Sequence, residues 1–386
     1  MSGSFLNRGV NVRVTPKRAG IAVAAAVAAG LAFGWSGLFN ISASTRHWGV
    51  TDWFLHWVMI NSVETWSIGV EVPDNLDDRA LIARGAGHYA TGCASCHGAP
   101  GRPRSPLTDV MSPPPPDLDA KVPTWEIAQL FTIVKHGVKF SGMPAWVSFD
   151  EREDEVWSVV AFLKKLPGMT PEEYKALAMG AENDGAVRGL VAIAHGPQGR
   201  GPREDTLADC ARCHGRDGLG RDGDAFPVIA GQSEDYLFDA LSAYAEGKRH
   251  SGIMQPAAAR LPYAELAALA EHYANQPAGR PRDAETPDPA LVTAGAKIAR
   301  EGVRATGTPA CQSCHGPSAA ARNLAYPSLS GQHASYLETQ LHLWEKEHDS
   351  RGGGPFREIM RKVAFRLTPD EIRAVAAYYA SLPPGT

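Results

Sequence analysis

Six cysteines and three histidines of this 386-residue chain share one pattern, Cys-x-x-Cys-His, which occurs three times. The residues are Cys93, Cys96 and His97; Cys210, Cys213 and His214; and Cys311, Cys314 and His315. This spacing is the attachment signature of c-type haem, in which two thiols bond to the porphyrin and the histidine ligates the iron. The chain has 6 cysteines in all, so none is left for a disulfide. The motifs predict three covalent haem c groups.

Two other uses of Cys-x-x-Cys are alternatives, namely a redox dithiol and half of a zinc site. A zinc site needs further ligands at matching offsets. A thioredoxin-like dithiol does not recur three times with a histidine after each copy. The pattern therefore favours haem at all three positions.

The N-terminal segment has the features of a membrane anchor. Arg8, Arg13, Lys17 and Arg18 precede an uncharged run over residues 19–45, whose apolar part approaches the length of a bilayer span. Basic residues before the span predict a cytoplasmic N terminus and place the rest of the chain in the periplasm of a bacterium, at the inner membrane. A cleaved signal peptide is the alternative, because small residues surround Ala43. We expect residues 1–46 to form the cytoplasmic start and the anchor.

Residues 47–73 form an aromatic segment that contains Trp48, Trp53, Phe54, Trp57 and Trp66. Such side chains gather at membrane–water boundaries. The alternative is a helix packed on the domain that follows. Both interpretations make the segment a docking element.

Module 1, residues 74–185, has the order helix, Cys-x-x-Cys-His, loop, helix, methionine, helix. A first helix from the Asp77–Asp78 caps to about Tyr89 contains Gly85, which allows another helix to approach closely. Further helices are predicted over 124–136 and 151–166, and a tether or partial helix over 170–185. The proline run 113–116 cannot be helical, and we expect a carbonyl there to accept the free ring N–H of His97.

This order resembles the class I cytochrome c fold, in which a methionine is the second axial ligand of the iron. The resemblance assigns that role to Met143, which lies 46 residues after His97 in a Gly-Met-Pro loop. A buried methionine that only fills the core is the alternative.

Modules 2 and 3, residues 186–282 and 283–386, are copies of one another. Six residues of module 2 recur 100 positions later: Pro227, Gly231, Gln232, Tyr236, Leu237 and Leu241. From Met254 onward the offset is 106, which places an insertion of about six residues around 350–355. The proline-rich stretch 275–289 separates the two modules.

The repeat resembles the tandem dihaem cytochromes c, in which a Met-x-x-x-Ala-x-x-Leu segment supplies the axial sulfur and opens the last helix. The resemblance pairs His214 with Met254 and His315 with Met360, and gives Pro227 and Pro327 the carbonyl role. His250 is a rival ligand to Met254. Other histidines of these modules, such as His195, His272 and His333, are expected on the surface or in packing.

The predicted fold is therefore all-α: three class I cytochrome c domains after a transmembrane helix. Iron held by His and Met has no open position, so no catalytic residue is expected and the chain is an electron carrier rather than an enzyme. The N-terminal pattern resembles cytochromes c found with haem-copper terminal oxidases of proteobacteria, which implies a respiratory chain. Alternatives are the cytochrome subunit of a periplasmic alcohol, aldehyde or sugar dehydrogenase that passes electrons to quinone, and a haem peroxidase.

The expected partners are the membrane and a redox protein: a terminal oxidase, a dehydrogenase or a soluble cytochrome. A net charge of −4 without a long basic run excludes a nucleic-acid partner. From the resemblance we expect modules 2 and 3 to form one rigid dihaem unit. Module 1 is expected to stand apart, as a relay on the membrane side.

Overall fold

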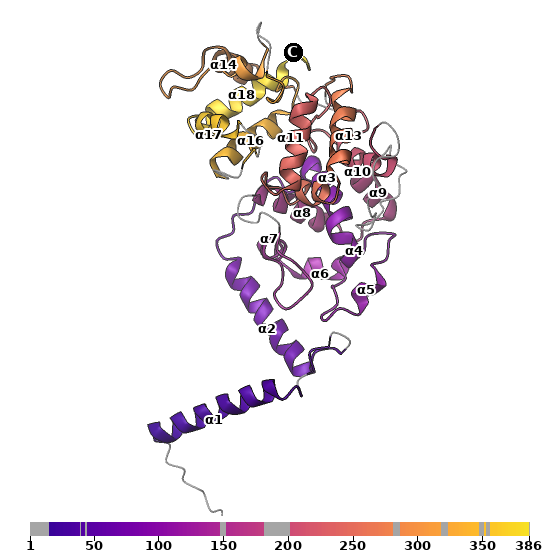
Figure 1. The fold of residues 1–386 in the computed structure, drawn as a ribbon, viewed down its shortest axis with the longest axis vertical. Helices are drawn as coiled ribbons and strands as arrows, with labels where there is room; N and C mark the ends of the chain where they lie inside the picture. The colour runs from indigo at the N-terminus through magenta and orange to yellow at the C-terminus, as the bar shows by residue number, and fades with distance from the viewer. Residues whose placement is uncertain are drawn as a thin grey trace, which may run out of the picture. The chain divides into compact units, whose positions relative to one another are not determined.

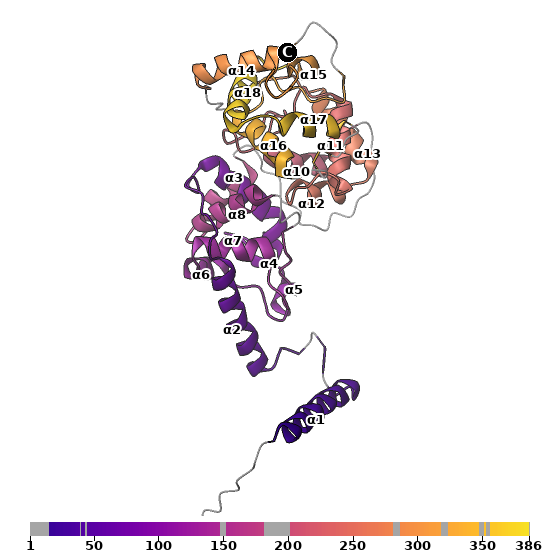
Figure 2. The same cartoon turned by 90° about the vertical axis from the view of Figure 1, so that its left-hand side faces the viewer.

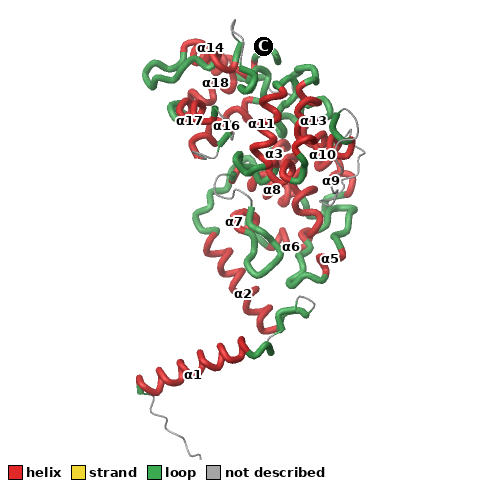
Figure 3. Tube along the Cα trace, in the orientation of Figure 1, coloured by secondary structure: helices red, strands yellow, loops and turns green. Residues whose placement is uncertain are grey.

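A computed structural model describes residues 15–38, 40–42, 45–146, 152–180, 201–280, 286–317, 323–346, 351–352 and 356–385. The described residues form helices and no strand (Figure 3), apart from isolated bridges between Ala99 and Arg102 and between Val303 and Thr308. The all-α prediction is confirmed. The chain divides into two units, Met1–Gly49 and Val50–Thr386, which are described separately.

The first unit contains helix α1, Pro16–Trp35, which begins where Thr15 caps the N–H of Arg18. Its 20 residues extend over roughly 30 Å, the thickness of the hydrocarbon layer of a bilayer. Its side chains are exposed, and among the described helices it is the one candidate for a membrane span.

Helix α2, Gly49–Trp66, leads into the second unit and coincides with the predicted aromatic segment. Only Val63 of its side chains is buried, whereas Trp53, Trp57 and Trp66 are more than half exposed. The helix therefore presents most of its aromatic side chains to its surroundings instead of packing them on module 1.

Module 1 is built on the crossing of α3, Arg79–His88, and α8, Glu153–Lys165 (Figure 1). Asp78 caps α3 by accepting the N–H of Ala80. A Cβ atom at Gly85 would lie 1.9 Å from the carbonyl oxygen of Ser158 in α8, so only glycine permits this crossing. The expected close approach at Gly85 is confirmed.

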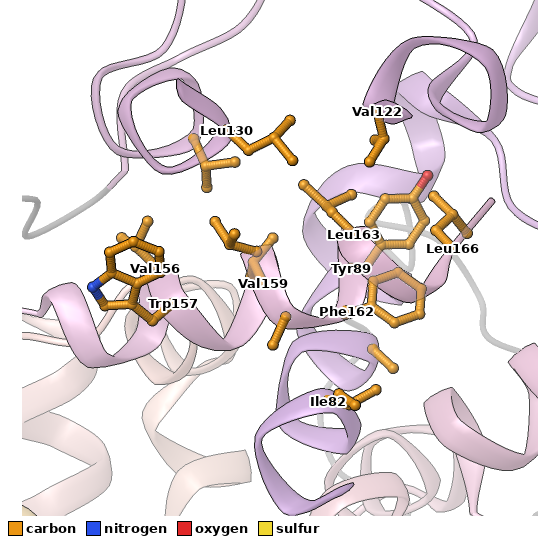
Figure 4. Packing of buried hydrophobic residues seen from close by; sticks show 14 of the residues in the cluster. Ile82, Tyr89, Val122, Leu130, Val156, Trp157, Val159, Phe162, Leu163 and Leu166 are labelled. Carbon is orange, nitrogen blue, oxygen red and sulfur yellow. The ribbon is translucent and has the colours of Figure 1, made fainter. Parts of the chain in front are cut away.

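The other elements of module 1 surround this crossing. They are a π turn at Tyr89–Cys93, α4 Ala94–His97, α5 Pro106–Asp109, α6 Leu118–Lys121, a 3₁₀ turn at Val122–Thr124, α7 Ile127–His136 and α9 Pro171–Met179. Figure 4 shows the core, in which Tyr89 from α3's end meets Phe162 of α8 with ring centroids 5.0 Å apart.

Some predicted helix ends of module 1 were wrong. Helix α7 begins at Ile127 and not at residue 124. The N–H of Glu126 donates to Gln129 Oε1, and this capping box makes Glu126 the residue that precedes the helix. The prediction of a tether or partial helix over 170–185 is confirmed as a partial helix by α9, whose start is fixed by a capping box between Thr170 and Glu173. Residues 181–185 and residue 151 lie outside the described residues.

Modules 2 and 3 repeat a similar arrangement. Module 2 contains α10 Glu204–His214, α11 Glu234–Ala245, α12 Met254–Ala259 and α13 Tyr263–Ala274; module 3 contains α14 Pro289–Glu301, α15 Gln312–His315, α16 Ala334–Lys346, α17 Arg357–Ala364 and α18 Pro369–Ser381. Helices α14 and α18 lie side by side (Figure 2), and a Cβ atom at Gly295 would be 1.9 Å from the carbonyl oxygen of Ala374.

The expectation that each methionine segment opens the last helix was wrong. Met254 and Met360 lie in short helices of their own, α12 and α17, and the last helices start separately. Helix α12 ends at Ala259, and Pro262 is the N-cap of the last helix of module 2, α13. In module 3, Thr368 is the N-cap of the last helix, α18, and Pro369 is its first residue.

The two repeats are paired by matching glutamines. The side chain of Gln232 bonds the backbone of Ser328, and the side chain of Gln332 bonds the backbone of Val228. Residues 228 and 328 are themselves equivalent at the offset of 100, so the contacts are related by a local twofold. The expected pairing of modules 2 and 3 is present.

The expectation that module 1 stands apart was wrong. Arg84 Nε donates to the carbonyl of Ala225 at 3.0 Å, and Arg152 Nη1 donates to the carbonyl of His250 at 2.9 Å. Ser251 also donates to Glu155 at 2.5 Å. Sequence alone identified Glu155 only as part of an acidic helix start, whereas its side chain is buried against module 2.

Candidate haem sites

Each motif histidine points one ring nitrogen at a proline carbonyl. His97 Nδ1 lies 3.2 Å from the oxygen of Pro116, His214 Nδ1 lies 3.2 Å from that of Pro227, and His315 Nδ1 lies 2.9 Å from that of Pro327. A carbonyl only accepts, so Nδ1 carries the proton and Nε2 keeps its lone pair. The predicted carbonyl contacts are thus present at all three motifs, and each ring is oriented for ligation through Nε2.

Burial shifts the pKa of several motif side chains. It lowers the pKa of His97 and of His214, because the charged imidazolium loses its hydration. It also raises the pKa of the Cys93 and Cys210 thiols to about 12, and that of Cys311 to about 11. Thiols with a raised pKa do not favour a thiolate-bound metal such as zinc.

In modules 2 and 3 the structure brings the predicted ligands to one cavity each. A cavity of about 240 Å³ is lined by Cys210, Cys213, His214 and Met254. A second, of about 250 Å³, is lined by Cys311, Cys314, His315 and Met360. His250 is not among the residues that line the first cavity, so the geometry favours Met254 over this rival.

The cavity of module 2 has walls from all three modules. Module 1 contributes Arg84, Gly87 and His88, while module 3 contributes Tyr336 and Gln340. Tyr336 and Gln340 also line the cavity of module 3. The central cavity therefore adjoins both neighbouring modules.

Met143 lies in a tight loop after α7. Its carbonyl accepts the N–H of Val138 at 3.1 Å, and its own N–H donates to Ser141 Oγ at 3.1 Å. A Cβ atom at Gly142 would lie 1.9 Å from the methyl carbon of Met111, so a second thioether packs against this loop. Sequence reasoning missed Met111, although its place two residues before the proline run was a usable signal.

His88 was also missed by sequence reasoning. It is buried in α3, its ring lies 4.5 Å from that of Trp146, and it lines the cavity of module 2. Burial lowers the pKa of His88 to about 4, and the nearby Arg212 cation adds to this effect. No sequence pattern distinguished it from an ordinary helix residue.

The other histidines of modules 2 and 3 have packing roles where they are described. His272 bonds the carbonyl of Arg216 at 3.2 Å, and His333 is buried. His195 lies outside the described residues, as does most of the predicted insertion around 350–355.

Comparisons with known proteins agree with this geometry. A family model described as cytochrome C oxidase, cbb3-type, subunit III matches residues 80–163, and the cytochrome c model matches residues 205–289 and 292–383. The chain is 38% identical over 177 residues to the thiosulfate dehydrogenase electron acceptor of Thiomonas intermedia, which covers 46% of this chain and 79% of that protein. The chain belongs to the cytochrome c family.

Cytochrome c4 proteins are further relatives. That of Pseudomonas aeruginosa is 33% identical over 195 residues, covering 50% of this chain and 94% of the relative. The crystal structure of reduced cytochrome c4 from Pseudomonas stutzeri is 31% identical, covers 47% of this chain and 99% of that chain, and has a TM-score of 0.41. The sequence similarity to cytochrome c4 confirms the resemblance of the C-terminal half to dihaem cytochromes.

As a cytochrome c, the chain carries covalent haem c and transfers electrons, and the residues at the module 3 cavity fit that group. Among the described residues, Tyr379 Oη and Arg249 Nε are buried there without a hydrogen-bond partner, as expected where a polar group of the haem completes the wall. Haem supplies the redox change of its iron when bound. The chain fixes the ring of each motif histidine through a proline carbonyl and surrounds the site with apolar side chains.

Proposed function

We propose that the chain is a membrane-anchored trihaem cytochrome c that delivers electrons to a haem-copper terminal oxidase. The observation that supports the partner is the match of module 1 to the cbb3-type subunit III model, in one chain with a pair of modules related to cytochrome c4. The proposed domains are residues 1–46, 47–73, 74–185, 186–282 and 283–386, with α1 as the anchor and the haem domains in the periplasm.

The proposed iron ligands are His97 with Met143, His214 with Met254, and His315 with Met360. Shared cavity walls support the last two pairs. The central position of the module 2 cavity supports a linear order of electron exchange, from module 3 through module 2 to module 1 or the reverse. Module 1 also lies close to the haem motif of module 2, because a Cβ atom at Gly87 in α3 would lie 3.3 Å from Cys213 Sγ.

A second candidate function is the reception of electrons from a thiosulfate dehydrogenase. It is favoured by two relatives named as electron acceptors of that enzyme, at 38% and 35% identity. Both similarities cover less than half of this chain. The two functions are compatible if a dehydrogenase reduces modules 2 and 3 and the oxidase withdraws electrons from module 1.

The experiment that tests the proposal uses the full chain in detergent with its haems attached. The reduced protein is mixed with the purified cbb3-type oxidase of the same organism, and oxygen uptake is followed. The oxidised protein is mixed separately with thiosulfate dehydrogenase and thiosulfate, and haem reduction is followed. Oxygen uptake that requires the cytochrome is the expected result, and its absence would reject the oxidase as partner, whatever the second mixture shows.

The anchor is tested by fractionation and reporter fusions. The protein should remain in the membrane after a high-salt wash, and a reporter fused after Thr386 should be active only when it functions outside the cytoplasm. Recovery of a soluble protein that begins near Ser44 would establish cleavage instead.

A further inference from the structure

The side chain of Glu155, in α8 of module 1, contacts the turn of module 2 at residues 251–252, which leads to Met254. Its Oε1 accepts the hydroxyl of Ser251 at 2.5 Å, and its Oε2 accepts the N–H of Gly252 at 2.6 Å. The Glu155 side chain is only 3% exposed. A carboxylate of one module thus holds two consecutive residues of another.

Ser251 passes this contact on to the backbone of the methionine. Its Oγ accepts the N–H of Met254 at 2.9 Å and that of Ile253 at 3.2 Å. An ionised carboxylate can only accept, so the single hydroxyl proton of Ser251 points at Glu155 and its lone pairs face the two N–H groups. The hydrogen bonds therefore run in one direction, from Met254 through Ser251 to Glu155.

Arg152 keeps the carboxylate in place. Its Nη2 lies 2.8 Å from Glu155 Oε1, and its Nη1 donates to the carbonyl of His250 at 2.9 Å. Burial raises the pKa of Glu155, while Arg152, Ser251 and Gly252 oppose that rise by favouring the ionised form. Because a buried carboxylate is costly without these partners, the arrangement has little freedom to shift.

Among the described residues, module 3 has no such arrangement at its corresponding turn. The residue equivalent to Ser251 at the offset of 106 is Arg357, whose side chain is 41% exposed and lies 3.8 Å from Glu358 of the same helix. Nearby Phe356 and Ile359 are also exposed. In the described part of the chain, the two copies of the repeat thus differ in what supports the methionine segment, and the contact from Glu155 of module 1 goes to that of module 2.

We propose that Glu155 is a positioning residue for Met254, by which module 1 fixes the thioether of the second haem and so tunes that haem alone. The proposal rests on the ligand assignment made above for Met254. With the turn held, Met254 would stay available as a ligand to a bound haem, and a methionine ligand would give that haem a high potential. With the turn loosened, a competing ligand should displace the sulfur more easily.

The test compares variants of the full chain with all haems attached. Glu155→Gln changes the accepting carboxylate, and Ser251→Ala removes the connecting hydroxyl without altering the charge of module 1. Ser251→Thr retains a hydroxyl and serves as rescue. Glu153→Gln is the matched control, because it makes the same change in the same helix at a residue that bonds Lys135 inside module 1.

The measurements are imidazole binding to the oxidised protein and a redox titration of each haem. In Glu155→Gln and Ser251→Ala we expect one haem to bind imidazole about tenfold more tightly, as for loss of one hydrogen bond to a charged group. The same haem should show a lowered reduction potential. Ser251→Thr and Glu153→Gln should match the wild type, and haem content with circular dichroism verifies folding.

Met254→Ala separates the two possible failures. If this variant leaves the sulfur-to-iron absorption band unchanged, the ligand assignment and the positioning role both fall. If it removes about one third of the band, as expected for one of three His/Met haems, while folded Ser251→Ala binds imidazole like the wild type, the ligand assignment stands and the role of Glu155 is rejected.

Discussion

Gln232 and Gln332 are equivalent residues of the two repeats, and each amide bonds both backbone groups of one residue in the opposite repeat. Gln232 Nε2 donates to Ser328 O at 2.8 Å, and its Oε1 accepts Ser328 N–H at 2.9 Å. Gln332 Nε2 donates to Val228 O at 2.8 Å, and its Oε1 accepts Val228 N–H at 3.0 Å. Because the N–H and the C=O of Ser328 and of Val228 are all bonded by these two side chains, the contacts fix the relative orientation of modules 2 and 3.

Replacing Gln332 should weaken this pairing. Gln332 is 7% exposed, so Gln332→Leu would leave the N–H and C=O of Val228 buried without partners, at about 1–3 kcal/mol for each group. We expect the free energy of unfolding of module 3, measured by guanidinium denaturation, to fall by roughly 2–5 kcal/mol.

Two matched variants control for the loss of an amide. Gln232→Leu should have a smaller effect, because Gln232 is less deeply buried and water can reach its partners. Gln312→Leu removes a bond to Tyr378 within module 3, so its effect on the free energy of unfolding gives the cost of losing an amide away from the contact with module 2. A Gln332→Leu protein as stable as the wild type would contradict this account.

The sequence predicted those parts of the sites that depend on local spacing. The Cys-x-x-Cys-His motifs placed the histidines, the prolines placed the carbonyls that orient them, and the repeat identified Gln232 and Gln332 as equivalent residues. Gly85 could be predicted as a helix-crossing residue because glycine in a helix interior is unfavourable without such a reason. These features can be recognised from short motifs or from the repeat itself.

The contacts between module 1 and module 2 could not be predicted in this way. Glu153, Asp154 and Glu155 follow one another at a helix start, where acidic residues are common on electrostatic grounds alone. Only the tertiary fold determines that Glu155 turns toward Ser251 while Glu153 pairs with Lys135. Glu155 and Ser251 are 96 residues apart in the sequence, so no local pattern indicates that they are in contact.

The proximity of Met111 to the Met143 loop yields a prediction about the first haem. Oxidised His/Met haem has a weak sulfur-to-iron band at the red end of the visible spectrum, to which each of three sites contributes about one third. Met143→Leu should remove that third. Met111→Leu changes the neighbouring thioether by the same amount and should leave the band intact. The reverse result would make Met111 the ligand, and a high-spin wild type that binds carbon monoxide stoichiometrically would contradict His/Met ligation altogether.

The last prediction concerns the stability of the interface around His88 in acid. Its pKa is lowered to about 4 from the ordinary histidine value of 6.5, because burial removes hydration from the imidazolium and the Arg212 cation lies near. The unfolded chain therefore binds a proton below pH 6.5 that the folded chain takes up only near pH 4. Stability should be unaffected above pH 7 and fall by roughly 1.4 kcal/mol per pH unit between these two values, roughly 3 kcal/mol in total.

The measurement is the free energy of unfolding of the full chain at pH 7, 5.5 and 4.5, for the wild type and for His88→Phe. Phenylalanine keeps an aromatic ring beside Trp146, whose centroid lies 4.5 Å from that of His88, but cannot take up a proton. Carboxylates titrate in both proteins, so the difference between their acid slopes isolates His88. The variant should lose less stability on acidification than the wild type. Equal slopes would show that His88 is hydrated in the folded protein and that module 1 does not close the cavity of module 2 at this residue.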